Sequence, residues 1–389
     1  MRKAAAAIVA LLCAAACATG ASPVGARPQP AQSTPSLPAQ GAFDRFYGSY
    51  RTEAGDILVV TRLGWFADLA DSTYRSLYSG TGSSRFAFGP GFRTPAPIAA
   101  SLEFGDGRLT VRRAGRATTA RRLALEQTDV SIPADGATLA GSITEPAGPG
   151  PHPAIVIVHG SEPGQRYYYD FWVGLYTSLG LTVLTYDKRG QGASSGRYPG
   201  EYPSEDSLTV YADDASAALG FLSGWPDVDS KRVGFHGGSQ GGWTVPLAMM
   251  RHGKAAFAIL VSAPAVTVGQ QVTWSDFSSG GARLPSQSVE QMDAGVRADH
   301  SGYDPAPALA ALSAPALWLL GRNDRTVPTD LCVERLNALR KRNIRIQLVD
   351  SGHGLLLNRS GLTADDDKAP GLAPGVISSI SDWIRAAVG

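Results

Sequence analysis

A serine set among glycines is the residue of this chain best suited to covalent chemistry. Ser239 lies in the run Gly-Gly-Ser-Gln-Gly at 237–241. The apolar run 232–235 before it predicts a strand, and residues 243–250 after it predict a helix. A serine on such a strand–turn–helix corner is strained and exposes its hydroxyl, and side chains at Gly237 and Gly241 would collide with the neighbouring strand and helix. The pattern predicts that Ser239 is a nucleophile.

A serine hydroxyl needs a base that a carboxylate holds in place. Asp324 follows the predicted strand 316–320, and His353 follows the predicted strand 344–349. Because the carboxyl ends of parallel strands share one edge of a sheet, both side chains are expected on the same edge as Ser239. The sequence therefore predicts a catalytic triad of Ser239, Asp324 and His353.

The run His159-Gly160-Ser161 follows the predicted strand 154–158, where folds with this kind of corner take an oxyanion donor. We expect the backbone N–H groups of Ser161 and Gln240 to bind the oxyanion while His159 orients the loop. Each such donor contributes about 3 kcal/mol in the transition state. The alternative is an ordinary turn between a strand and a helix.

Other polar residues are expected to have structural roles. Asp350 is predicted to be a loop or cap residue that points away from His353, and His236 to pack beside Ser239. His252 and His300 are expected to be polar surface or helix residues. Lys188 and Arg189 are predicted to form a structural ion pair or loop brace. The acidic run 365–367 is predicted to be a solvated loop without metal-ligand partners, and no metal or cofactor is expected.

The second half of the chain alternates short apolar runs with amphipathic stretches. The expected strands are 154–158, 182–186, 232–235, 257–261, 316–320 and 344–349, and the clearest helices are 169–179 and 208–222. This alternation predicts an α/β catalytic domain over 127–389, with a mostly parallel sheet flanked by helices and a hairpin at Asp135-Gly136. A small cap is expected at about 265–312, where Trp274, Phe277 and Tyr303 favour small or medium substrates.

A small β-rich domain is expected over 42–126. Its predicted strands are 57–63, 74–78, 85–88, 101–104 and 108–112, with a hairpin turn at Asp106-Gly107. We expect this β-rich domain to be either a structural appendage that packs on the catalytic domain or a shield at the entrance of the active site.

The first residues predict export. Residues 1–18 carry Arg2 and Lys3 before a short apolar stretch, as in a signal or lipoprotein signal peptide, and residues 19–41 form a Pro/Ala-rich linker. Cys17 is either an acylated lipid anchor or a small residue beside an ordinary cleavage site. The expected location is periplasmic, on a membrane as a lipoprotein, or secreted. Cys332 is the single cysteine after this region, so no internal disulfide is expected.

Composition excludes some partners. The 389 residues have a formal net charge of +1 and 18% charged residues, which fits a compact globular enzyme. This near balance of charges gives no electrostatic reason to propose a nucleic-acid partner, which would need a clustered basic face. The oligomeric state is not predicted.

From about 130 to the end, the chain resembles the α/β-hydrolase superfamily, in particular the bacterial esterase and acylaminoacyl-peptidase-like (dienelactone-hydrolase-like) group. The matching motifs are His-Gly-Ser at 159–161, Asp-Lys-Arg-Gly-x-Gly at 187–192 and Gly-x-Ser-x-Gly-Gly at 237–242. The resemblance implies a cofactor-free Ser-Asp-His triad. The chain departs from related esterases at Glu162 and Pro163, where Gly-Pro is common.

The expected function is hydrolysis of carboxylic esters through an acyl-enzyme. The first alternative is a peptidase of the acylaminoacyl or serine aminopeptidase type, acting on short or acylated peptides. The second is a non-catalytic envelope binding protein that keeps the hydrolase fold.

Overall fold

The computed structural model describes residues 36–39, 41–253 and 255–389. The predicted signal segment, Cys17 and most of the predicted linker lie outside the described residues. Within those ranges, no helix is both long and apolar enough to cross a membrane.

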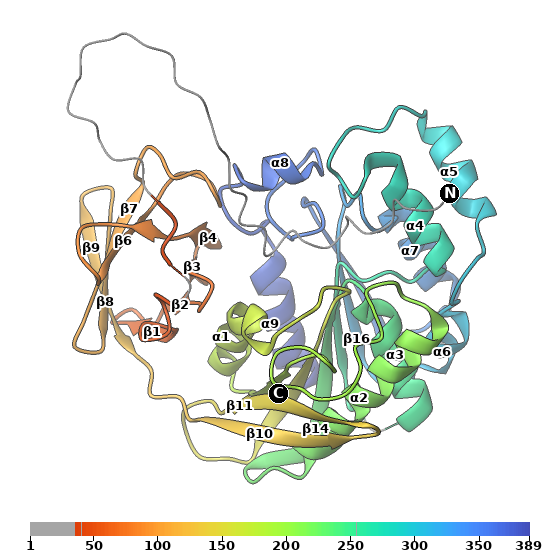
Figure 1. Ribbon diagram of the computed structural model, residues 1–389, viewed down its shortest axis with the longest axis horizontal. Coiled ribbons are helices and arrows are strands. Elements are labelled where there is room, and N and C mark those ends of the chain that lie inside the picture. The colour runs from red at the N-terminus through yellow and green to blue at the C-terminus, as the bar shows by residue number, and fades with distance from the viewer. Residues whose placement is uncertain (1–35, 40, 254) are drawn as a thin grey trace.

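The N-terminal part of the described chain forms one antiparallel nine-stranded sheet, here called the N-terminal sheet (Figure 1). Its strands are β1 (Gly48–Thr52), β2 (Ile57–Val60), β3 (Trp65–Asp68), β4 (Thr73–Ser76), β5 (Tyr78–Ser79), β6 (Arg85–Phe88), β7 (Ala100–Gly105), β8 (Arg108–Arg113) and β9 (Arg116–Arg122). The spatial order is β4-β3-β2-β1-β9-β8-β7-β6-β5. Inward-facing residues such as Phe66, Phe88 and Leu109 fill its core.

The predicted hairpin at Asp106-Gly107 is confirmed. Both residues have positive φ, 49° and 69°, and they join β7 to β8. This is the backbone that a two-residue turn between twisted strands requires. The sequence did not predict β9, because six of its seven residues are exposed and no apolar alternation marks it.

The second part of the chain forms an eight-stranded sheet, here called the central sheet. It consists of β10 (Gln127–Ala134), β11 (Ala137–Thr144), β12 (His152–Val158), β13 (Thr182–Tyr186), β14 (Val228–Gly238), β15 (Ala258–Val261), β16 (Ala316–Gly321) and β17 (Ile344–Val349). The order is β10-β11-β13-β12-β14-β15-β16-β17. In this order the strands from β13 to β17, with β12 among them, run parallel to one another, whereas β11 is antiparallel to both β10 and β13.

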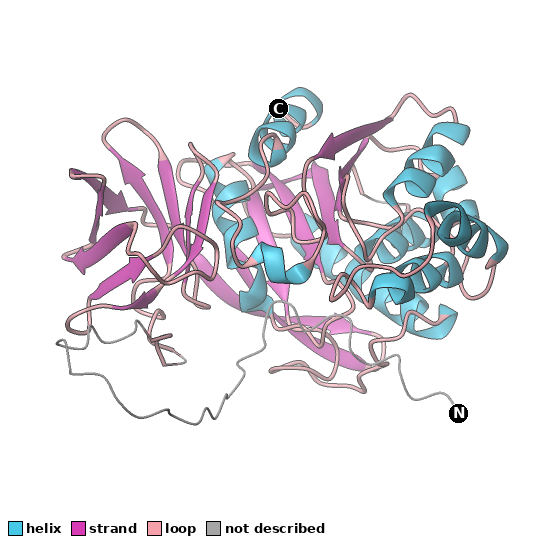
Figure 2. Cartoon of the chain, turned by 90° about the horizontal axis from the view of Figure 1, so that it is seen from above, coloured by secondary structure: helices cyan, strands magenta, loops and turns pink. Residues whose placement is uncertain are grey.

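Helices cover both faces of the central sheet (Figure 2). After the 3₁₀ helix η2 (Arg166–Tyr169), they are α1 (Asp170–Ser178), α2 (Glu205–Ser223), α3 (Gly241–His252), α4 (Val268–Ser278), α5 (Val289–Ala298), α6 (Ala306–Ala311), α7 (Thr329–Ala338), α8 (Thr363–Asp366) and α9 (Val376–Ala387). Successive residues of β12 face opposite sides: Ile155 packs with α1 and α9, while Val156 packs with α2 and α3. A strand buried on both faces is continuously apolar, which is why the sequence marked these strands well.

The N-terminal sheet packs against the α1 side of the central sheet. Trp65, Tyr74 and Phe92 belong to the same buried cluster as Phe171 of α1. At this junction Arg62 donates to the fully buried carboxylate of Asp170 through its backbone N–H and its guanidinium. The two parts of the described chain therefore share apolar core and two ion pairs, Arg62–Asp170 and Arg93–Asp367.

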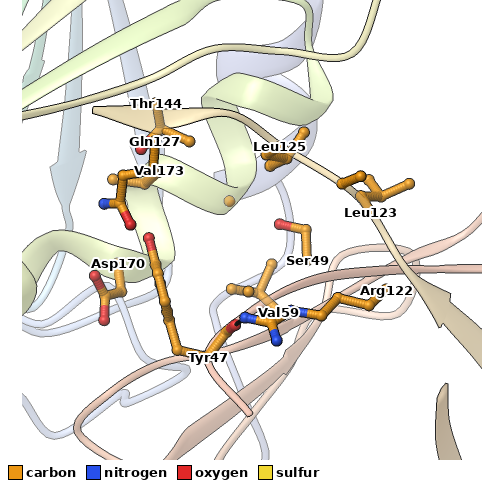
Figure 3. A pocket seen from close by; sticks show the side chains of 13 residues that line it. Tyr47, Ser49, Val59, Arg122, Leu123, Leu125, Gln127, Thr144, Asp170 and Val173 are labelled. Carbon is orange, nitrogen blue, oxygen red and sulfur yellow. Dashed lines mark hydrogen bonds between the residues drawn. The ribbon is translucent and has the colours of Figure 1, made fainter. Parts of the chain in front are cut away.

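A cavity of about 360 Å³ lies at the same junction (Figure 3). Tyr47 and Arg122 line it from the N-terminal sheet, and Asp170 lines it from α1. None of the predicted triad residues contributes to its wall. The cavity is therefore separate from the edge of the central sheet where the predicted nucleophile lies.

Candidate active site

Ser239 occupies the corner between β14 and α3 with a φ of 48°. This left-handed conformation is uncommon for a residue with a Cβ and is typical of a serine forced into a sharp turn. A Cβ on Gly237 would lie 2.9 Å from Val245, and one on Gly242 would lie 2.5 Å from the Pro264 carbonyl oxygen. The tight turn thus depends on glycine at these two positions.

The prediction that a side chain at Gly241 would collide with its neighbours is wrong. The nearest atom to a Cβ there is the Val158 carbonyl oxygen, at 3.8 Å, which is ordinary van der Waals contact. The close approach falls one residue later, at Gly242, where α3 passes the segment that follows β15. The sequence alone does not distinguish the two glycines, because both are adjacent in the motif.

The structure brings Ser239, His353 and Asp324 into one hydrogen-bonded chain. His353 Nε2 lies 3.1 Å from Ser239 Oγ, and His353 Nδ1 lies 2.8 Å from Asp324 Oδ2. Asp324 Oδ1 accepts the backbone N–H groups of Thr326 and Val327 at 2.7 and 2.8 Å. A carboxylate held in this way cannot rotate away from the imidazole, so the ring keeps its Nε2 directed at the serine hydroxyl.

The pKa of His353 lies above its ordinary value. Burial of the ring acts to lower this pKa, but the charge of Asp324 and its hydrogen bond raise it further than burial lowers it. The charges of Asp366 and Glu162 act in the same direction as Asp324. The imidazole therefore becomes neutral, and able to accept a proton, at a higher pH than an unperturbed histidine does.

The loop after β12 runs directly beside the serine. A Cβ on Gly160 would lie 3.5 Å from Ser239 Cβ. His159 fixes this loop to the end of β13, since its Nε2 lies 2.5 Å from the Tyr186 carbonyl oxygen. Ser161 follows in the same loop, and Gln240 precedes the first residue of α3. Gln240 is therefore adjacent to Ser239, and Ser161 follows the glycine that passes beside it.

Glu162 places an ionised carboxylate in this loop. Burial acts to raise its pKa, but a hydrogen bond to His159 and the charge of Lys188 lower it to about 2. Tyr169 also donates its hydroxyl to this carboxylate. The departure at Glu162 thus introduces a buried negative charge that is stabilised by neighbours from η2 and from the end of β13.

Lys188 is a residue of this site that the sequence did not single out for catalysis. Its ammonium contacts the loop after β12, whereas Arg189 forms a buried ion pair with Asp214 in which the closest atoms lie 2.5 Å apart. The prediction of an ion pair or brace therefore holds for both residues, each with its own partner. The signal in the sequence was a lysine two residues after a strand of the buried type.

The remaining polar residues have other partners. Asp350 lies 3.5 Å from Arg322 at the surface, away from the triad as predicted. His236 is fully buried, its Nδ1 lies 2.8 Å from the Tyr176 hydroxyl, and burial lowers its pKa to about 3. It is therefore a neutral core residue beside the corner.

The prediction of a solvated loop at 365–367 is wrong in part. Asp365 and Asp366 belong to the short helix α8, and Asp366 is buried. The Asn358 side chain donates to the Asp366 carboxylate at 2.8 Å. The sequence shows three consecutive acidic residues but does not reveal the partner of Asp366. That partner, Asn358, lies eight residues earlier, on the segment after His353.

The segment between β15 and β16 contains α4 and α5, in the region predicted as a cap. Trp274 Nε1 donates to the Asp324 carbonyl oxygen at 3.1 Å, and Gln271 donates to the Thr326 carbonyl oxygen at 2.7 Å. This segment therefore braces the loop that carries Asp324. Its predicted role as a cap over a substrate stays a prediction.

The chain is similar to known proteins over about half of its length. Residues 167–367 match the Prolyl oligopeptidase family, which is more than half of the chain. The uncharacterized protein Rv2307c of Mycobacterium tuberculosis is 31% identical over 205 residues, which cover 52% of this chain and 63% of that protein. The chain thus matches less than two thirds of that relative's length.

Two solved structures are similar to this chain. Pyrococcus horikoshii acylaminoacyl peptidase aligns with a TM-score of 0.50 and 16% identity, covering 86% of this chain and 59% of that one. Pyrococcus furiosus esterase Pf2001 aligns with a TM-score of 0.49 and 17% identity, covering 68% and 94%. By its match over residues 167–367 and by its central sheet, the chain belongs to the prolyl oligopeptidase family, within the α/β-hydrolase superfamily of serine hydrolases.

Proposed function

We propose that this protein hydrolyses carboxylic esters through a covalent acyl-enzyme on Ser239. The observation that carries the proposal is the hydrogen-bonded chain in which His353 lies between Ser239 Oγ and Asp324 Oδ2, at 3.1 and 2.8 Å. A neutral imidazole at this position can take the serine proton as the hydroxyl attacks an acyl carbonyl. The ionised Asp324 then stabilises the imidazolium that forms.

In the first half-reaction, Ser239 Oγ bonds to the carbonyl carbon and the carbonyl oxygen becomes an oxyanion. The proposed donors to this oxyanion are the backbone N–H groups of Ser161 and Gln240. The tetrahedral intermediate collapses, the alcohol leaves with the proton held by His353, and the acyl group stays on the serine. In the second half-reaction, His353 deprotonates water, which releases the acid and restores the serine.

A peptidase acting on short or acylated peptides is a second candidate for the same triad. Membership of the prolyl oligopeptidase family favours it, since the family name describes peptide cleavage. Amide hydrolysis uses the same steps but requires His353 to protonate a much more basic leaving amine. An ester requires less of His353, because its leaving alcohol is less basic than an amine.

Comparing p-nitrophenyl esters with aminoacyl and N-acyl-aminoacyl p-nitroanilides separates the two candidates. We expect kcat/KM for the best ester to exceed that for the best anilide. The reverse order would assign the site to peptide hydrolysis. With either substrate, Ser239→Ala should lower kcat by about a million-fold, and turnover close to wild type would contradict the triad.

A further inference from the structure

The ammonium of Lys188 is enclosed by the two segments that carry the proposed oxyanion donors. Lys188 Nζ donates to the carbonyl oxygens of Gly160 and Glu162 at 2.7 and 3.0 Å, and to Gln240 Oε1 at 3.5 Å. These three acceptors match the three N–H groups of an ammonium. One side chain therefore connects the loop after β12 to the start of α3.

The bond to Gly160 matters most, because that carbonyl shares a peptide group with the N–H of Ser161. In a planar trans peptide the C=O and the N–H point in opposite directions, so fixing one direction fixes the other. A cation on the oxygen also polarises the peptide and strengthens its N–H as a donor. Lys188 thus acts on the far side of one of the two proposed oxyanion donors.

Burying a charge at this position has a cost that the surroundings only partly offset. Lys188 is 3% exposed, and no carboxylate within ion-pair distance of its nitrogen is found in the described part of the chain. Its nitrogen lies 4.4 Å from the centre of the Tyr211 ring, which offers a cation–π contact. A neutral residue of the same length would fill the space without this desolvation cost.

We propose that Lys188 is a positioning residue of the oxyanion hole, which orients and polarises the Gly160–Ser161 peptide so that the Ser161 N–H stabilises the tetrahedral intermediate. The proposal rests on the proposed function, because it assigns a role within the same acyl-transfer site. Lys188 does not touch the reacting atoms. It acts through the backbone of the loop.

The charge on Lys188 should also limit the reaction at alkaline pH. Burial lowers the pKa of Lys188 to about 8, against the opposing effects of Glu162 and Glu201. Of the titratable groups that face it, Glu162 stays ionised with a pKa of about 2, and the pKa values of Tyr198 and Tyr211 are raised to about 12 and higher. The ammonium is present below pH 8 and lost above it, so kcat should fall as pH rises through 8.

The test compares Lys188→Met, which keeps the length and the apolar stem, with Lys341→Met as a matched control. Lys341 also donates to a backbone carbonyl, that of Leu312, at 2.9 Å, but before β16 and β17 begin, at the opposite ends of these strands from Asp324 and His353. For p-nitrophenyl ester hydrolysis we expect Lys188→Met to lower kcat by about 10- to 100-fold with KM within about two-fold. The decline of kcat above pH 8 should disappear. Lys341→Met should match wild type.

Inhibitor binding gives a readout of the oxyanion hole itself. An alkyl trifluoromethyl ketone forms a tetrahedral oxyanion on the serine, whereas the matching methyl ketone stays trigonal. Lys188→Met should weaken the trifluoromethyl ketone by about the same 10- to 100-fold and leave the methyl ketone unchanged. Equal losses for both ketones, or unchanged kcat, would overturn the role of Lys188.

Two further outcomes are distinguishable. If Lys188→Met does not fold, the inhibition constant of the trifluoromethyl ketone on wild type is measured from pH 7 to 10. A rise through pH 8 supports the role of Lys188, and a flat profile overturns it. If the wild type neither hydrolyses the esters nor binds the trifluoromethyl ketone, the proposed function has failed, independently of Lys188.

Discussion

Asp324 holds His353 with one carboxylate oxygen and its own loop with the other. Oδ2 lies 2.8 Å from His353 Nδ1, while Oδ1 accepts two backbone N–H groups. The arrangement follows from the central sheet, because β16 and β17 are parallel neighbours whose last residues, Gly321 and Val349, pair directly. Loops that leave adjacent strands at the same level bring residues three or four positions later into contact.

Asp324→Asn should remove the carboxylate that accepts from His353 Nδ1 while leaving the fold in place. The amide can present an N–H to His353 Nδ1, which favours the tautomer that cannot accept the serine proton. We expect kcat for p-nitrophenyl esters to fall by about 10⁴-fold. Asp350→Asn is the matched control, since Asp350 follows β17, the strand that leads to His353, and is exposed. Similar rates for both variants would contradict the assignment of Asp324.

The acid limb of the pH profile should respond to Asp366. Its charge raises the pKa of His353, and His353 must be neutral to act as a base, so activity is lost as pH falls through that pKa. Asp366→Asn removes this charge and should move the acid limb of kcat/KM to lower pH by a fraction of a unit. Asp365→Asn serves as the control, because Asp365 pairs instead with Lys368. An unchanged limb in Asp366→Asn would show that this charge does not reach His353.

Two glycine substitutions should change stability in opposite directions. Gly242→Ala puts a Cβ 2.5 Å from the Pro264 carbonyl oxygen and should lower the free energy of unfolding by about 1–3 kcal/mol. Gly220 lies exposed inside α2 with open space around it, so Gly220→Ala should raise that free energy by about 0.5–1 kcal/mol. Urea denaturation of both variants measures the difference. A neutral Gly242→Ala would mean that the segment after β15 can move aside.

The Arg62–Asp170 ion pair at the domain junction should contribute more to the free energy of unfolding than an ion pair at the surface. Arg62→Met leaves the fully buried carboxylate of Asp170 without its cation, and we expect a loss of about 3 kcal/mol in the free energy of unfolding. Arg113→Met breaks a pair with Asp71 in which both side chains are about half exposed, and it should cost less than about 1 kcal/mol. Thermal unfolding of the two variants tests this order. Equal losses would indicate that water reaches Asp170.

Much of the central sheet and of the candidate site was predictable because its signals are local. Strands buried on both faces are apolar runs, and Ser239 and Asp324 lie within a few residues of the ends of two such strands. His353 lies just past β17, the partly exposed edge strand. The glycines around Ser239 mark a turn that few other residues allow. These features depend on neighbours in sequence, so they are visible without knowledge of the fold.

The parts that could not be predicted depend on partners distant in sequence. Lys188 was predicted as part of an ion pair or loop brace, but its contacts with Gly160 and Gln240 could not be predicted, because these residues are 28 and 52 positions away. Asp366 reads as solvated until Asn358 is seen beside it. Strand β9 lacks an apolar pattern because most of its side chains are exposed, and only pairing with β1 and β8 makes it a strand.

The nucleophilic role of Ser239 can be tested directly by labelling with a fluorophosphonate and locating the adduct by mass spectrometry of peptides. Ser239 Oγ lies 3.1 Å from His353 Nε2, so the fluorophosphonate should phosphonylate this hydroxyl without added cofactor. We expect one adduct, on Ser239, that is absent in Ser239→Ala and slowed in His353→Ala. An unlabelled wild type, or equal labelling of wild type and Ser239→Ala, would contradict the assignment of this protein as a hydrolase that acts through Ser239.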